Sequence, residues 1–231
     1  MSNGTRGEMI SFPANGRTAE GYLSMPPSGG GPGLIVVQEW WGLVGHIKDV
    51  TDRFAAEGFV ALAPDLYHGE STRSPDQAGK LLMALNIAEA GKDMRGAARH
   101  LLAMDAVRPR KVGSVGFCMG GQLALFAACE YPEEITTAVD FYGVHPRVQI
   151  DPERLAGPVM AHFGRTDRTT PEEAATALIE RVRGAGKEIE AHFYDAGHAF
   201  MNDQRPEAYD EKAATQAWER TVDFLKKQLG G

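Results

Sequence analysis

Residues 111–121 read KVGSVGFCMGG, a short apolar strand that runs into a Gly-x-Cys-x-Gly turn and then a helix. A nucleophile on such a turn needs strained backbone geometry, and Gly116 and Gly120 remove the side chains that would clash where strand and helix cross. Cys118 projects at the helix N-terminus, where free N–H groups favour a thiolate and an oxyanion. The turn therefore predicts a nucleophilic cysteine, with the backbone N–H of Met119 as an oxyanion donor. A cysteine packed in an ordinary turn is the alternative.

The composition indicates one α/β domain over residues 1–231, which is long enough for a substantial core. The formal charge is −7, and the chain has no basic tract that could neutralise a run of phosphates, so we expect no nucleic-acid partner. No apolar run approaches the roughly 20 residues of a membrane span, and residues 1–6 contain no apolar signal core. We therefore expect a cytoplasmic protein without a membrane partner, in which Cys129 is a core residue and forms no disulfide with Cys118.

Strands alternate with helices along most of the chain. Asn15-Gly16 separates two short strands, at residues 10–12 and 20–25, and predicts an antiparallel hairpin at the N-terminal edge. Continuous apolar runs are typical of strands covered on both faces. Such strands are expected at residues 34–37, 59–63, 111–117, 136–142, 158–163 and 189–194. The pattern predicts a mostly parallel, doubly wound sheet flanked by helices.

Two helical segments carry more specific expectations. One helix begins at Ser74-Pro75 and a second ends near Arg108-Pro109, so residues 70–106 are longer than an ordinary crossover and are a candidate lid. Further on, the segment 170–173, Thr-Pro-Glu-Glu, reads as a capping box that opens a helix closed by Gly184.

Four chemically useful residues each follow a predicted strand: Glu39, Cys118, Asp167 and His198. The carboxyl ends of parallel strands meet at one edge of a sheet, so these side chains are expected to converge. A thiol with a pKa of about 8.5 needs a base at neutral pH, and the base needs a third group to fix its tautomer. His198 and Asp167 fit these roles, and the order nucleophile, acid, histidine is that of the α/β-hydrolase fold. Read singly, each is as well explained as a loop or turn residue.

Together these motifs resemble the dienelactone hydrolase (carboxymethylenebutenolidase) family of the α/β-hydrolase superfamily. The resemblance rests on Gln38-Glu39, on the turn at Cys118, on the Gly164-x-x-Asp167 turn and on the segment 197–200, Gly-His-Ala-Phe, in the family's order and spacing. It implies a lactone or ester hydrolase that forms a thioester through a Cys118–His198–Asp167 triad, without a metal or an organic cofactor.

The resemblance also assigns roles around the sulfur. Glu39 would help to keep the resting thiol protonated and would take its proton when substrate binds; tethering of a loop by Glu39 is the alternative. The backbone N–H groups of Trp40 and Met119 would form the oxyanion hole.

The chain departs from the family pattern where the substrate is held. Members that act on dienelactone bind its carboxylate with arginines, one of them four residues beyond the histidine, where this chain has Asn202. Side chains near the strand ends suggest an apolar or aromatic pocket wall instead. These side chains are Trp41, Tyr67, Tyr142, Phe200 and Met201, with Asn202 beside them. We therefore expect a neutral ester or aryl lactone as the small-molecule substrate. His46 and His145 are further candidates for the wall, and the histidines lack the spacing of metal ligands.

Other functions remain open at this point. A thioesterase, acyl transferase or peptidase would use the same triad, and a non-hydrolytic, redox-responsive protein would also need a reactive Cys118 thiolate. The presence of a base and an acid partner favours the hydrolase, because a thiol sensor needs no base to activate water. The sequence leaves the oligomeric state open between a monomer and a weak homodimer.

Overall fold

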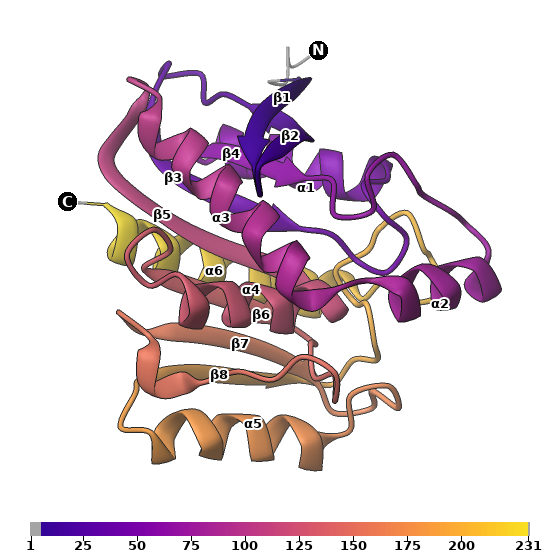
Figure 1. Ribbon diagram of the computed structural model, residues 1–231. Helices are drawn as coiled ribbons and strands as arrows, with labels where there is room; N and C mark the ends of the chain where they lie inside the picture. The colour runs from indigo at the N-terminus through magenta and orange to yellow at the C-terminus, as the bar shows by residue number, and fades with distance from the viewer. Residues whose placement is uncertain (1–5, 231) are drawn as a thin grey trace.

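The computed structural model describes residues 6–230 (Figure 1). Residues 1–5, most of the segment in which we expected no signal core, lie outside the described part. Eight strands form one sheet in the spatial order β1-β2-β4-β3-β5-β6-β7-β8. The strands are β1 (Glu8–Ala14), β2 (Arg17–Ser24), β3 (Gly31–Val37), β4 (Val60–Pro64), β5 (Val107–Phe117), β6 (Thr137–Phe141), β7 (Val159–Gly164) and β8 (Ile189–Tyr194).

The sheet is parallel from β4 to β8, and the expected antiparallel hairpin forms its N-terminal edge. β1 pairs with β2 and β2 pairs with β4, both antiparallel. The turn between β1 and β2 lies at Asn15 and Gly16, whose φ angles of 52° and 72° are both in the left-handed region that Asn-Gly tolerates. The predicted mostly parallel α/β sheet with an antiparallel edge is confirmed.

Helices cover both faces of the sheet, as expected for a doubly wound fold. The helices are α1 (Gly45–Ala56), α2 (Pro75–Ala84), α3 (Ile87–Ala103), α4 (Met119–Glu130), α5 (Glu172–Gly184) and α6 (Glu211–Leu229), with a short 3₁₀ turn at Pro152–Arg154. Apolar residues of α1 and α6 belong to one core cluster, and those of α3, α4 and α5 belong to the other. In Figure 1, α3 and α4 accordingly lie in front of the sheet.

The central strand β3 shows why a continuous apolar run suits this architecture. Leu34 and Val36 pack in the core shared with α1 and α6, whereas Ile35 and Val37 pack in the opposite core. All four side chains are fully buried. Because successive side chains of a strand point to opposite faces, a strand covered on both sides must be apolar at every position.

One predicted helix end and one predicted helix cap are wrong, whereas the predicted end of the later helix at Gly184 is correct. The second helix ends at Ala103, and Arg108-Pro109 lies within β5, which pairs at its start with Gly31. The capping box also does not form, because α5 begins at Glu172 with no side-chain cap. The hydroxyl of Thr170 instead donates to the backbone oxygen of Tyr142 at 2.9 Å. In both places a tertiary contact outweighs the local sequence signal.

The candidate lid at residues 70–106 divides into two parts. Helix α3 is a packed layer of the sheet, with Met94, Ala97 and Leu101 fully buried. Helix α2 projects from the body of the molecule in Figure 1, and only Ala78 and Leu81 of its residues are buried. Any covering role of this segment therefore belongs to α2.

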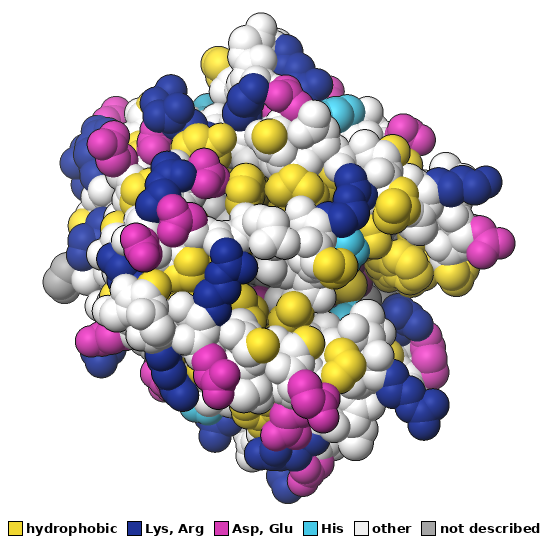
Figure 2. All heavy atoms as spheres, turned by 60° about the horizontal axis from the view of Figure 1, so that its bottom comes forward, with side chains coloured by type: hydrophobic (Ala, Val, Ile, Leu, Met, Phe, Trp, Pro, Cys, Tyr) yellow, Lys and Arg dark blue, Asp and Glu magenta, His cyan; other side chains and the backbone are white. Residues whose placement is uncertain are grey.

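Acidic and basic side chains are interspersed over the face shown in Figure 2, without a continuous stripe of either sign. Over residues 6–230, no helix combines the length and the apolar character that crossing a membrane requires.

Candidate active site

The turn after β5 holds Cys118 in a strained backbone conformation, with φ 57° and ψ −126°. A Cβ at Gly116 would lie 1.9 Å from the backbone oxygen of Gly120, and a Cβ at Gly120 would lie 2.3 Å from that of Gln38. Only glycine fits at either position. The backbone N–H of Cys118 donates to Phe141 at 2.9 Å, which ties the turn to the end of β6.

His198 connects the sulfur to a buried carboxylate. Its Nε2 atom lies 3.2 Å from Sγ of Cys118, and its Nδ1 atom lies 2.7 Å from Oδ2 of Asp167. The other oxygen of Asp167 accepts the backbone N–H groups of Thr169 and Thr170, at 2.7 and 2.9 Å. The carboxylate is therefore fixed by its own loop, and the imidazole is fixed by the carboxylate. Three residues separated by up to 80 positions in the chain thus form one continuous hydrogen-bonded series.

The environment of His198 favours its charged form. Burial lowers the pKa of its imidazole, but the hydrogen bonds to Asp167 and Cys118 outweigh burial and raise the pKa to about 10. An imidazolium beside a sulfur stabilises a thiolate. The arrangement is suited to proton transfer between the sulfur and the imidazole.

Two backbone N–H groups beside Cys118 are free to receive an oxyanion. Met119 is the first residue of α4, where N–H groups have no partner within the helix. Trp40 follows the end of β3, and neither N–H donates to an acceptor in the described part of the chain. Such donors, fixed before substrate arrives, are the usual components of an oxyanion hole.

Glu39, the second residue after β3, is 1% exposed. Its Oε2 atom accepts a hydrogen bond of 2.9 Å from Nδ2 of Asn202. Burial raises the pKa of Glu39, while the Asn202 amide and the positive charges of His198 and Arg205 oppose that shift. Hydrogen bonds therefore bring Cys118, His198 and Asp167 together, whereas the hydrogen-bond partner of Glu39 is Asn202.

A cavity of about 440 Å³ opens over Cys118 and His198. Its wall is mainly apolar. The other lining residues are Trp40, Leu82, Met119, Tyr142, Val144, His145, Thr169, Thr170, Arg205 and Ala208. Tyr142 and His145 were expected there from the sequence. Leu82 and Arg205 were not, because nothing in the sequence signals which side chains of α2 and of the loop before α6 face the strand ends.

The remaining predicted pocket residues do not line this cavity. Phe200 and Met201 are fully buried in the core shared with α6, so their prediction as wall residues is corrected by packing. Tyr67 lines a separate hollow beneath α2. Burial is the main cause of the raised pKa of its hydroxyl.

Trp41, His46 and Asn202 line an adjoining cavity of about 400 Å³, which shares Arg205 with the first. Arg73 also faces this second space. The guanidinium carbon of Arg205 lies over the indole ring of Trp41, 5.5 Å from the ring centre. The two cavities therefore meet at Arg205.

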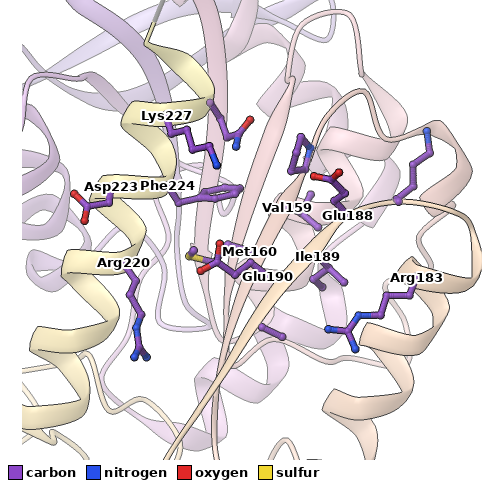
Figure 3. A pocket seen from close by; sticks show the side chains of 14 residues that line it. Val159, Met160, Arg183, Glu188, Ile189, Glu190, Arg220, Asp223, Phe224 and Lys227 are labelled. Carbon is purple, nitrogen blue, oxygen red and sulfur yellow. The ribbon is translucent and has the colours of Figure 1, made fainter.

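A larger hollow, of about 770 Å³, lies at the opposite ends of β7 and β8, between α5 and α6 (Figure 3). Arg183, Glu190 and Asp223 are among the charged side chains that surround it. It contains no cysteine, serine or histidine, so it offers no nucleophile–base pair.

A mostly parallel sheet flanked by helices, with a cysteine, an aspartate and a histidine after β5, β7 and β8 in that order, defines an α/β-hydrolase fold. Residues 19–229 match the model of the dienelactone hydrolase family. The chain belongs to the dienelactone hydrolase family, as its motifs predicted, and is a hydrolase of that type.

Similar proteins cover nearly the whole chain. Protein usf of Aquifex pyrophilus is 36% identical over 96% of this chain and 99% of its own. A protein of Aquifex aeolicus provisionally named carboxymethylenebutenolidase is 34% identical over the same shares. The crystal structure of a provisionally named dienelactone hydrolase from Klebsiella pneumoniae is 27% identical, with a TM-score of 0.84, and covers 94% of this chain and 96% of that one.

Proposed function

We propose that this protein hydrolyses a small lactone or ester through a thioester formed on Cys118. The observation that carries the proposal is the series Cys118–His198–Asp167, with contacts of 3.2 and 2.7 Å, beside two unpaired backbone N–H groups. Nucleophile, base, orienting carboxylate and oxyanion donors are the four components that acyl transfer requires.

The acylation step follows from this geometry. The Cys118 sulfur attacks the carbonyl carbon of the substrate, and the carbonyl oxygen, now an oxyanion, accepts hydrogen bonds from the N–H groups of Trp40 and Met119. When the tetrahedral intermediate collapses, the bond to the leaving oxygen breaks and His198 donates its Nε2 proton to that oxygen. The product is a thioester on Cys118 and a released alcohol, or the opened ring of a lactone.

Deacylation uses the same groups in the reverse sense. His198, now neutral, takes a proton from water, and the hydroxide attacks the thioester carbon. The sulfur leaves as a thiolate beside the imidazolium, while Asp167 holds the ring in position in both steps. The resting state is restored without a metal or an external redox partner.

The cavity indicates a substrate that is largely apolar around the scissile bond. Leu82, Val144 and Ala208 provide its aliphatic wall, and Trp40 and Tyr142 provide its aromatic wall. We propose a neutral ester or aryl lactone, because Asn202 replaces the family's anchoring arginine. Arg205 is the one guanidinium in the lining, so an acidic group on the substrate would have to bind there.

Initial rates on p-nitrophenyl acetate, a neutral enol lactone and dienelactone test this proposal. We expect Cys118→Ala to lower kcat by about a thousandfold or more, since removal of a nucleophile leaves only binding and the oxyanion hole. Cys129→Ala is the matched control, because Cys129 is fully buried in the core away from the cavity, and it should retain the wild-type rate per folded molecule.

Three results would contradict the proposal. Full turnover by Cys118→Ala would remove the thioester from the mechanism. Rapid alkylation of Cys118 without turnover of any of the three substrates would favour the reactive-thiol protein. Faster transfer of the acetyl group to an added amine or alcohol than to water would favour an acyl transferase on the same triad.

A further inference from the structure

Strand β8 forms one edge of the sheet, and half of its backbone groups face away from the sheet. Within residues 6–230 it pairs with β7 alone. The backbone oxygens of Glu188 and Tyr194 accept N–H groups from the start of β7 and from the residue after its end, so the even-numbered residues of β8 face β7. Because successive backbone groups of a strand alternate in direction, those of Ile189, Ala191 and Phe193 face outward.

The outer edge of β8 is accessible. Strands β4, β6 and β7 are buried at every position, whereas residues 190–193 of β8 are half-buried or exposed. In Figure 3 the start of β8 lies between α6 and α5, beside the hollow of about 770 Å³. At the opposite edge of the sheet, β1 contains Pro13, which has no N–H group to donate. Edge strands commonly carry such residues against unwanted pairing, and β8 contains no proline.

The charged side chains of β8 are complementary to those of a second copy of the same strand. In an antiparallel pair with a two-fold axis at Ala191, each residue lies opposite one that is equally far from the axis on the other copy. Glu190 then faces His192 of the second copy, and His192 faces its Glu190. Just outside the strand, Lys187 faces Asp195 in the same way. Opposite charges at facing positions stabilise an antiparallel pair.

The apolar side chains of β8 are complementary in the same arrangement. Ile189, Ala191 and Phe193 all belong to the core on the α5 side of the sheet, and the last two are only half-buried. With the axis at Ala191, Phe193 of each copy lies beside Ile189 of the other. Ile189 and Ala191 also line the hollow at the start of β8. Pairing would therefore bury apolar surface that the single chain leaves partly exposed.

Other positions of the two-fold axis are less favourable. An axis at Ile189 places Glu188 opposite Glu190, and an axis at Glu190 places that carboxylate opposite itself. Like charges at facing positions are destabilising. An axis further along the strand leaves Glu190 opposite uncharged residues. The charges therefore favour the register about Ala191.

We propose that the protein forms a homodimer in which the β8 strands of two copies pair antiparallel about Ala191, so that the two sheets join into one continuous sheet. Ala191 exchanges its N–H and C=O with Ala191 of the second copy, and Ile189 does so with Phe193. The main chain and the apolar row supply the affinity, and the charged pairs set the register. The occupant is a second copy because the strand is complementary to itself, which binding of an unrelated chain would not require.

Sedimentation velocity tests the dimer over about 1 to 200 µM chain, because weak specific interfaces have micromolar affinities. We expect the mass of the wild type to rise from one chain towards two as the concentration increases. Ala191→Pro should raise Kd at least about tenfold, since it removes the N–H groups at the centre of the pairing and places a ring there. The N–H of Ala191 faces away from β7, so the sheet within each chain keeps its hydrogen bonds, and thermal unfolding checks that the variant folds.

Two charge variants test the register. Glu190→Lys removes the carboxylate that faces His192, and His192→Glu places two carboxylates opposite each other, so each variant alone should raise Kd about fivefold. An equal mixture of the two should restore the wild-type affinity. In the mixed dimer the new lysine faces the new glutamate, and the remaining Glu190 faces the remaining His192. Glu8→Lys is the matched control, because Glu8 is exposed on the opposite edge strand, β1, and its Kd should be unchanged.

Three results would overturn the proposal. A wild type that sediments as one chain at the highest concentration would exclude the dimer and leave β8 open to an extended segment of another protein. A dimer that Ala191→Pro and both charge variants leave unchanged would use a different surface. Failure of the mixture to restore affinity would contradict the register about Ala191. Should Ala191→Pro fail to fold, the two charge variants and their mixture decide the question by themselves.

Discussion

His46 is a buried titratable residue that the proposed chemistry does not use. Its side chain is 1% exposed, and neither ring nitrogen has a hydrogen-bond partner within the described residues. Asp203 lies 3.8 Å from Nδ1, too far for a hydrogen bond. Burial outweighs this carboxylate and, with the charge of Arg53, lowers the pKa of His46 to about 4. The folded protein therefore holds a neutral imidazole where the unfolded chain would hold a charged one at mildly acidic pH.

This difference makes the stability of the protein depend on pH. Between pH 6.5 and pH 4 the unfolded chain binds a proton at His46 that the folded protein does not, so the free energy of unfolding falls as the pH falls through that window. The contribution of this group between pH 7.5 and pH 5 is about 2 kcal/mol. Urea unfolding at the two pH values measures it, and His46→Phe should lose less stability than the wild type by about that amount.

The pKa of His162 is also lowered in the folded protein, but His162 is present in both the wild type and His46→Phe. Burial lowers its pKa well below the ordinary value, and its ring nitrogens contact the hydroxyls of Tyr194 and Thr221. The difference between wild type and His46→Phe therefore isolates His46. Equal losses of stability in the two proteins would show that the imidazole of His46 is solvated or charged in the folded state.

At the scale of elements, the turn between β5 and α4 is the most constrained junction of the fold. Gly116→Ala would place a methyl group 1.9 Å from the backbone oxygen of Gly120, and neither strand nor helix can move away without losing its packing. We expect a loss of about 3 kcal/mol in the free energy of unfolding, together with loss of activity.

Gly79→Ala is a matched control for the same chemical change. Gly79 lies inside α2, and a Cβ there would have nothing within 4 Å. Alanine is the better helix former, so this variant should gain about 0.5–1 kcal/mol. Thermal unfolding of both variants measures the contrast, and a similar shift in both would mean that the turn can relax.

The elements were predictable where one local pattern and the tertiary structure agree. The runs at residues 34–37 and 111–117 become β3 and the end of β5, because a buried parallel strand needs apolar residues on both faces. The capping box failed because the hydroxyl of Thr170 bonds to Tyr142, a residue 28 positions away. No window of sequence around Thr170 contains that partner.

The candidate site, too, was predictable only in part from the sequence. Cys118, Asp167 and His198 each follow a strand, so the parallel sheet alone brings them together. The Asn202–Glu39 bond joins residues 163 positions apart, and Arg205 reaches the cavity from the loop that precedes α6. Such contacts depend on the paths of loops, which strand order does not determine. Phe200 was misassigned because an aromatic residue beside His198 looks the same in sequence whether it lines a cavity or fills a core.

At the scale of the whole molecule, Arg147 ties the loop after β6 to the end of α2. Its guanidinium donates to the backbone oxygens of Leu82, Met83 and Leu85, at 2.9, 3.0 and 3.2 Å. These carbonyls lie at the C-terminus of α2, where a positive charge is favourable. Since Leu82 lines the cavity over Cys118, Arg147 fixes one wall of the candidate site from a distant part of the chain.

Arg147→Gln should therefore loosen α2 without unfolding the core. We expect hydrogen exchange of the α2 amides to become at least about tenfold faster, because two or three bonds of about 0.5–1.5 kcal/mol each are lost. The KM for p-nitrophenyl acetate should rise while kcat changes less. Arg154→Gln is the control, since Arg154 pairs with Glu130 away from the cavity. Unchanged exchange in Arg147→Gln would show that α2 is held by its apolar face alone.

The strained backbone at Cys118 affects which residue evolution would retain at this position. A side chain at φ 57° and ψ −126° costs about 1–3 kcal/mol in backbone strain. A lineage that no longer needed the reaction would gain stability by replacing this residue with glycine, which adopts that conformation freely. A descendant with glycine at position 118 and the rest of the fold preserved would therefore lack the activity but would be more resistant to heat than the active enzyme.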